Sequence, residues 1–125
     1  MKFAARQNSP VVIQLPREID ACNAAEVTAE FRVAYRPGTI IVADMVKATF
    51  CDSLGTRELV NVHYWATAWQ CELRVARPSA QVLRVWQLLG ADQILAIYPS
   101  LAAARAGSNR RWTEARLLVG LERCH

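Results

Sequence analysis

The hydrophobic and polar positions of this chain change period several times, and each change indicates a separate element of secondary structure. Residues 11–15 are β-branched and apolar and stop at Pro16, which is typical of a strand end. A shorter, weaker strand is predicted at residues 3–6. Residues 39–43 form a near-continuous β-branched run, which predicts a strand covered on both faces. Two further strands are predicted at residues 72–76 and 94–98.

Between these strands, apolar residues recur with the 3.6-residue period of amphipathic helices. Asn23 and Glu26 have the spacing of a capping box, so the first helix is predicted to begin at Ala24 and to end at Pro37. Three further helices are predicted, from Ser53 to Trp69, from Pro78-Ser79 to Gly90, and from Leu101 to Ala106 with Ser100 as its cap. In the helix that starts at Ser53 the predicted buried residues are Leu59, Val62, Ala66 and Trp69. In the helix that starts at Pro78-Ser79 they are Val82, Val85, Trp86 and Leu89.

Strands that alternate with helices in this way predict an α/β fold: a single domain with a mixed sheet of four or five strands and four helices. A chain of 125 residues is long enough to bury a core of its own and short enough for one domain. The domain is predicted to cover residues 1–107. Residues 108–125 are predicted to be a C-terminal extension that is partly helical, from Thr113 onward.

Composition and charge narrow the classes of protein that fit. Hydrophobic residues make up 53% of the chain and charged residues 21%, as in globular proteins. The uncharged stretches are too short to span a membrane, and the start of the chain lacks an apolar signal-peptide core, so we expect a cytoplasmic protein that does not bind membranes. The formal charge of +4 comes from 15 basic and 11 acidic residues that are scattered except near the C-terminus, so direct nucleic-acid binding is not expected.

The cysteines and histidines do not predict a metal site, a cofactor or a structural disulfide. No spacing typical of zinc ligands occurs among Cys22, Cys51, Cys71 and Cys124, and His63 and His125 stand alone. We expect Cys51 and Cys71 to pack as small hydrophobic residues.

One stretch combines a buried strand with polar residues at the start of a helix. The strand ends at Asp44, and Asp52-Ser53 follows after a short loop where the second helix begins. Function often collects at the carboxyl ends of strands in α/β sheets. A serine at a helix N-terminus exposes its hydroxyl near unpaired backbone N–H groups and the positive end of the helix dipole, which accommodates a phosphate. The alternative is that Asp52 or Ser53 only caps the helix.

Three pieces of the sequence, in order, resemble the STAS domain of bacterial anti-anti-sigma factors (anti-sigma factor antagonists). Glu18-Ile19-Asp20 is similar to a Gly-Glu-Ile/Leu-Asp motif at the end of a strand, with Arg17 in place of the glycine. The segment from Ile40 to Gly55 resembles a strand, Asp, loop, Phe and Asp-Ser-Ser/Thr-Gly signature. The segment from Leu73 to Ile97 resembles the closing strand, helix and strand. The resemblance covers about residues 8–106.

The resemblance implies a switch protein without catalytic activity. Ser53 matches the serine that is phosphorylated in the family. The kinase is a partner that is also the anti-sigma factor, and a phosphatase removes the phosphate. The unphosphorylated domain binds the kinase and so frees a sigma factor. The implied partner-binding residues are Asp20, Asn23, Asp52, Ser53, Leu54, Gly55 and Arg57. The loops after Asp20 and Asp44 are expected to lie beside Ser53 on one edge of the sheet. Whether the protein forms a homodimer is left open.

Departures from the family signature keep a second interpretation open. Leu54 replaces the second hydroxyl residue, and Thr56-Arg57 replaces small or apolar residues after Gly55. The alternative is a STAS scaffold or adaptor without a phospho-switch, for example the small subunit of a lipid-transport ATPase complex. An enzyme is disfavoured, because Cys51-Asp52-Ser53 has no histidine nearby in sequence to act as a base.

Overall fold

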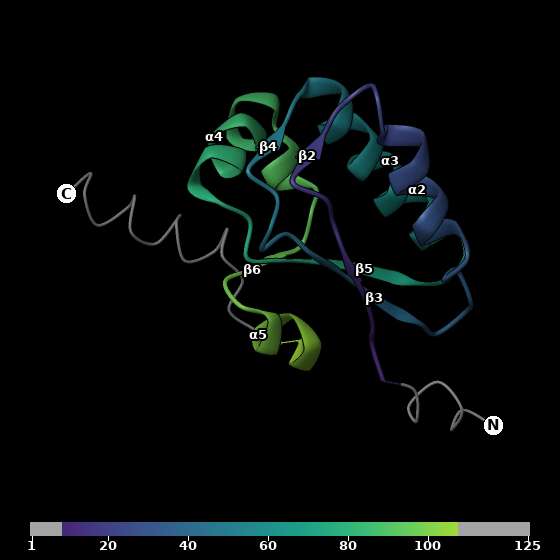
Figure 1. Cartoon of the computed structure of the whole chain (residues 1–125). Helices are drawn as coiled ribbons and strands as arrows, with labels where there is room; N and C mark the ends of the chain where they lie inside the picture. Colours follow the sequence, from purple (N-terminus) through teal and green to yellow (C-terminus); the bar gives the residue numbers. More distant parts are fainter. Residues whose placement is uncertain (1–8, 108–125) are drawn as a thin grey trace.

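Four parallel strands form the central sheet of this computed structural model, which describes residues 9–107 (Figure 1). The strand order is β1-β3-β5-β6. These strands are β1 (Val11–Gln14), β3 (Ile40–Asp44), β5 (Glu72–Ala76) and β6 (Ile97–Tyr98). A second, two-stranded parallel sheet joins β2 (Glu18–Ile19) to β4 (Phe50–Cys51), with Ile19 opposite Cys51. The helices are α2 (Ala24–Arg32), α3 (Ser53–Ala68), α4 (Ala80–Leu89) and α5 (Leu101–Ala106), and a 3₁₀ turn covers Ala91–Gln93.

The predicted α/β class, the single domain and the four helices are confirmed. Every strand pair among residues 9–107 is parallel, so the mixed sheet is not seen in this part of the chain. The physical reason is the connectivity: a helix lies in each crossover between successive strands of the main sheet, and such crossovers return the chain in a parallel direction. The predicted strand at residues 3–6 and the predicted helix from Thr113 lie outside the described residues.

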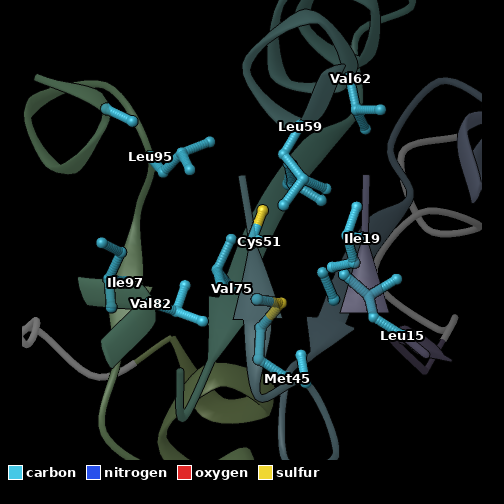
Figure 2. Packing of buried hydrophobic residues seen from close by; sticks show 14 of the residues in the cluster. Leu15, Ile19, Met45, Cys51, Leu59, Val62, Val75, Val82, Leu95 and Ile97 are labelled. Carbon is cyan, nitrogen blue, oxygen red and sulfur yellow. The ribbon is translucent and has the colours of Figure 1, made fainter. Parts of the chain in front are cut away.

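Side chains of the central strands alternate between two cores. Helices α2, α3 and α4 cover one face of the sheet, and α5 covers the other (Figure 1). Ile41 and Ala43 of β3 belong to the larger core, and Val42 between them belongs to the smaller one with Ala104 of α5. The prediction of a strand covered on both faces is therefore confirmed. Figure 2 shows the larger core, in which the buried Cys51 lies among aliphatic side chains.

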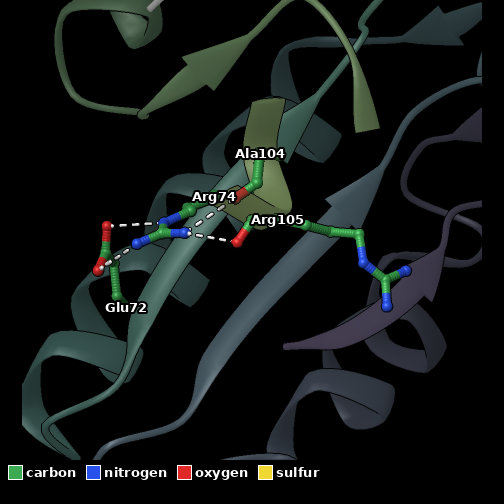
Figure 3. A network of polar contacts seen from close by, with 4 residues as sticks. All are labelled: Glu72, Arg74, Ala104 and Arg105. Carbon is green, nitrogen blue, oxygen red and sulfur yellow. Dashed lines mark hydrogen bonds and ion pairs between the residues drawn. The ribbon is translucent and has the colours of Figure 1, made fainter. Parts of the chain in front are cut away.

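A partly buried arginine fastens α5 to its face of the sheet. Arg74 of β5 donates from Nη1 to the carbonyl of Ala104 at 2.9 Å, and from Nε to Glu72 at 3.0 Å (Figure 3). A β-carbon at Gly107 would lie 2.9 Å from the Arg74 guanidinium, and Gly107 also has a φ of +69°. Glycine at this position therefore lets the chain leave α5 close against Arg74.

Two predicted core positions are wrong, and for the same reason. Trp69 and Leu89 are 51% and 52% exposed. Each stands at the end of its helix, and a residue with positive φ then turns the chain, Gln70 at +62° and Gly90 at +80°. The small residue after the turn is buried in place of the larger one, Cys71 after Gln70 and Ala91 after Gly90. The last predicted strand is shortened to Ile97–Tyr98 because the backbone N–H groups of Ile94 and Leu95 donate to the carbonyl of Ala91 in the preceding turn.

Among the described residues, no helix has both the length and the apolar character that a membrane crossing requires.

Candidate functional site

The N-terminus of α3 exposes a serine that the helix does not need for its own cap. Asp52 is the N-cap residue, and its carboxylate accepts a hydrogen bond from the backbone N–H of Gly55 at 2.8 Å. Ser53 is the first residue of the helix and is exposed, and its hydroxyl makes no hydrogen bond to any described residue. The predicted start of the helix is confirmed. Of the two residues considered as caps, Asp52 has that role.

The short β2–β4 pairing fixes where this helix begins. The backbone N–H of Asp52 donates to the carbonyl of Ile19 at 3.2 Å, directly after the paired strands end. A β-carbon at Gly55 would overlap the carbonyl oxygen of Ile19, so the close approach requires glycine at position 55. The residue after Ile19 is Asp20, and the turn that Asp20 begins is therefore held next to the start of α3.

Asp20 and Asn23 build this turn with their own side chains. The carboxylate of Asp20 accepts from the N–H of Cys22 at 2.9 Å. The side chain of Asn23 accepts from the N–H of Asp20 at 3.0 Å and donates to the carbonyl of Glu18 at 2.7 Å. Asn23 thus precedes α2 as predicted, but the capping box is wrong, because its side chain is bonded backward to the turn and not to the helix.

The position of Arg17, where the family motif has glycine, is free of backbone strain. Arg17 is not among the described residues with positive φ. Its carbonyl accepts hydrogen bonds from the N–H groups of Thr49 at 2.8 Å and Phe50 at 3.2 Å. The close contact with α3 is made at Ile19 instead, so this departure leaves the site intact.

An apolar hollow lies beside Ser53. Its volume is about 430 Å³. Its lining comes from the first turns of α3 and from the end of α4 and the turn that follows: Ser53, Leu54, Thr56, Arg57, Val60, Leu89, Ala91 and Ile94. Leu89 and Ile94 are 52% and 38% exposed there. The hydrophobic pattern does not predict this hollow, because Leu89 has the helical spacing of a core residue and yet lines the surface here.

Asp44, which precedes the second loop expected beside Ser53, is buried at the end of β3. Its side chain is 2% exposed and accepts two hydrogen bonds from Arg77, from Nε at 2.9 Å and from Nη2 at 3.0 Å. These bonds hold the pKa of Asp44 below the ordinary carboxyl value. The loop after Asp44 reaches the surface at Lys47. Lys47 and Asn23 both line a shallow hollow there.

Burial shifts the pKa values of the thiol and of the imidazole that lie nearest to Ser53 in the described sequence. The Cys51 thiol is buried, which raises its pKa, and lies 3.5 Å from the Thr56 hydroxyl. Cys51 and Cys71 are both buried, as predicted. Burial lowers the pKa of His63, which lies in the second half of α3, away from Ser53. Within residues 9–107 no three His, Cys, Asp or Glu side chains come together as a metal site would require.

Comparison with known proteins assigns the chain to a family. A search of curated proteins finds no match. A scan against models of protein families matches the STAS domain over residues 2–104, which is most of the chain and includes the whole of the site around Ser53. The chain therefore belongs to the STAS domain family.

Proposed function

We propose that this protein is an anti-sigma factor antagonist whose binding is switched by phosphorylation of Ser53. STAS domains are found in anti-sigma factor antagonists and related proteins. The observation that carries the proposal is the state of Ser53: an exposed hydroxyl at the first position of α3, left free because Asp52 caps the helix. A hydroxyl in this position is accessible to a kinase, and its modification leaves the cap in place.

The partner in this proposal is an anti-sigma factor that is also a serine kinase, in the cytoplasm of a bacterium, and a phosphatase reverses its action. The unmodified surface combines the apolar side chains of Leu54, Leu89 and Ile94 with the exposed Arg57. Apolar groups in a hollow with polar groups around it are typical of protein-binding surfaces. The turn of Asp20 and Asn23 and the residues Asp52 and Gly55 complete the proposed contact.

Charge explains how the switch works. A phosphoserine carries about −1.5 to −2 charges at pH 7, and at position 53 it would stand beside the carboxylate of Asp52 at the rim of the apolar hollow. Charge brought into a contact surface and left unpaired weakens binding, often by several kcal/mol. Arg57 is one turn further along α3, on the same face as Ser53, and can offset part of that charge. We therefore expect phosphorylation to release the partner.

The second candidate function is a scaffold or adaptor subunit that binds its partner constantly. Leu54 favours it, because this residue lines the hollow where the family signature has a second hydroxyl. An adaptor would use the same hollow, for example against the ATPase of a lipid transporter. The two functions differ in whether Ser53 is ever modified.

Intact-mass spectrometry of the protein purified from its own cell distinguishes them. The switch predicts a fraction heavier by about 80 Da, one phosphate, that is lost in Ser53→Ala. Ser79→Ala and Ser100→Ala are the matched controls. Their hydroxyls accept hydrogen bonds from Val82 and Ala103, so they sit at helix starts but serve as caps. A chain that is never heavier under any growth condition, or an adduct retained in Ser53→Ala, would rule out the switch.

A further inference from the structure

The far end of α3 carries a concentration of exposed aromatic side chains. Tyr64, Trp65 and Trp69 are 56%, 61% and 51% exposed. Trp65 and Trp69 line a groove of about 430 Å³ between α2 and α3, whose other wall includes Tyr35 and Arg32. Tryptophan, tyrosine and arginine are the residue types most enriched at the centres of protein interfaces. Trp65 is 12 residues beyond Ser53, roughly 18 Å along the helix, and no residue lines both this groove and the hollow beside Ser53.

The groove also contains two opposite charges that do not pair with each other. Arg32 on the α2 side and Glu58 on the α3 side both line it. Neither joins an ion pair within residues 9–107, and the only described hydrogen bond of the Glu58 carboxylate is a long one, 3.5 Å, from Asn61. One positive and one negative group on the same surface are complementary to a partner that carries them in the reverse order.

We propose that this groove is the interface of a two-fold symmetric homodimer. In such an interface the same patch serves both copies, and residue i contacts residue j while j contacts i. Arg32 of each copy then pairs with the second copy's Glu58, which gives two reciprocal ion pairs. Burying the exposed rings in such an interface requires a hollow on each copy that accepts a projection from the other. The groove is the hollow, and Trp65, the most exposed of its aromatic residues, is the projection.

The exposed aromatic side chains supply part of the area that a dimer of standard size buries. An aromatic side chain contributes roughly 150–250 Å² when it is fully buried. Three rings that are each more than half exposed therefore offer roughly 250–400 Å², against about 800 Å² per partner in a standard interface. The α2 side of the groove, with Arg32 and Tyr35, supplies further area.

Charge reversal with mixing tests this geometry directly. Arg32→Glu places a carboxylate opposite the second copy's Glu58, and Glu58→Arg places two cations opposite each other, so each variant alone should be monomeric in sedimentation equilibrium. Mixed in equal amounts, they restore both ion pairs across a mixed dimer, and the dimer mass should return. The unmodified full chain should reach twice 14.0 kDa.

A second variant tests the apolar part of the interface. Trp65→Ser should weaken the dimer at least about 30-fold, as expected for a central aromatic residue. Leu88→Ser is the matched control, since Leu88 is 82% exposed and lies outside the groove, and it should leave the dimer intact. Thermal unfolding of each variant confirms that it is folded. A wild-type chain that stays monomeric at its highest soluble concentration overturns the proposal, as does a mixture that stays monomeric or a Trp65→Ser variant that dimerises like wild type.

Discussion

The α-carbon of Gly55 packs against the backbone of Ile19 so closely that a β-carbon at position 55 would overlap the Ile19 carbonyl oxygen and lie 2.9 Å from its carbonyl carbon. The atoms that would have to move are backbone atoms. They belong to the β2–β4 pairing, and the same Ile19 carbonyl accepts the N–H of Asp52. Gly55 therefore controls both the start of α3 and the position of the neighbouring turn.

Gly55→Ala should destabilise the fold by about 1–3 kcal/mol, as overpacking against a fixed backbone does. The measurement is the free energy of unfolding in urea. Gly90→Ala serves for comparison: Gly90 has a φ of +80°, but a β-carbon added there would meet nothing within 4 Å. Both variants should lose stability, and Gly55→Ala should also weaken binding of the partner. If Gly55→Ala were as stable as wild type, the backbone of β2 would be able to move away from the added methyl group at little cost in free energy.

Ser53→Asp should weaken partner binding and leave the fold intact. A negative group at the first turn of a helix stabilises it by roughly 0.3–1 kcal/mol, so the thermal midpoint should stay level or rise slightly. The two measurements are the thermal midpoint and the affinity for a co-purified kinase-like partner. Authentically phosphorylated protein should show the larger effect, because aspartate carries less charge than phosphate. Unchanged affinity together with a large fall in midpoint would mean that Ser53 is structural.

The hollow beside Ser53 gives a prediction with an internal control. Leu89→Asp places a charge in the hollow and should reduce partner affinity by at least about tenfold, the range expected for a contact residue. Leu88→Asp changes the neighbouring residue, which is 82% exposed and outside the hollow, and should bind like wild type. Titration calorimetry with the partner measures both. Equal losses in the two variants would point to a general effect of charge on α4.

The division of roles between Asp52 and Ser53 can be tested through stability alone. Ser79→Ala removes a side-chain cap that accepts from Val82 at 3.1 Å, and should cost about 1 kcal/mol. Ser53→Ala removes a hydroxyl with no described partner and should cost much less. Chemical denaturation of both variants gives the comparison. A loss in Ser53→Ala as large as in Ser79→Ala would show that the Ser53 hydroxyl has a structural partner after all.

The ion pair of Asp44 and Arg77 should make stability depend on pH at the acid end. The pKa of Asp44 is lower in the folded chain than in the unfolded one, chiefly because Arg77 donates to its carboxylate. The pair therefore stabilises the fold above the unfolded carboxyl pKa, about 3.9, and this contribution is lost as the pH falls through the folded value. Asp44→Asn should be less stable than wild type at neutral pH, and the difference should shrink in acid. A difference that is constant from neutral to acid pH would contradict this.

Local patterns predicted the parts of the fold that local chemistry decides. The helix starts near Ser53, Ala80 and Leu101 follow from the polar residues before them, and the predicted Ser100 cap forms. The strand over residues 40–44 follows from its β-branched run. In each case the information lies within a few residues of the feature itself.

The rest depended on contacts between distant segments. The two-residue strands β2 and β4 are too short to leave a period in the sequence, although they set the position of α3. Asn23 has the spacing of a capping residue, yet the nearby carbonyl of Glu18 competes successfully for its side chain. The hollow beside Ser53 and the groove between α2 and α3 arise from where helices end relative to the sheet, which the hydrophobic pattern does not specify.

The β2–β4 pairing has a consequence for the order in which the molecule folds. A hydrogen bond beside it, from the Thr49 hydroxyl to the Arg17 carbonyl, spans 32 residues, whereas the contacts within α3 span three or four. Closing a long loop reduces the entropy of the chain before the contact contributes any stabilisation, so local helices form sooner than long-range pairs. We expect α3 to be helical on a newly made chain before Ile19 reaches it. An enzyme that recognises Ser53 together with the turn of Asp20 would then act on the finished domain and pass over the incomplete one.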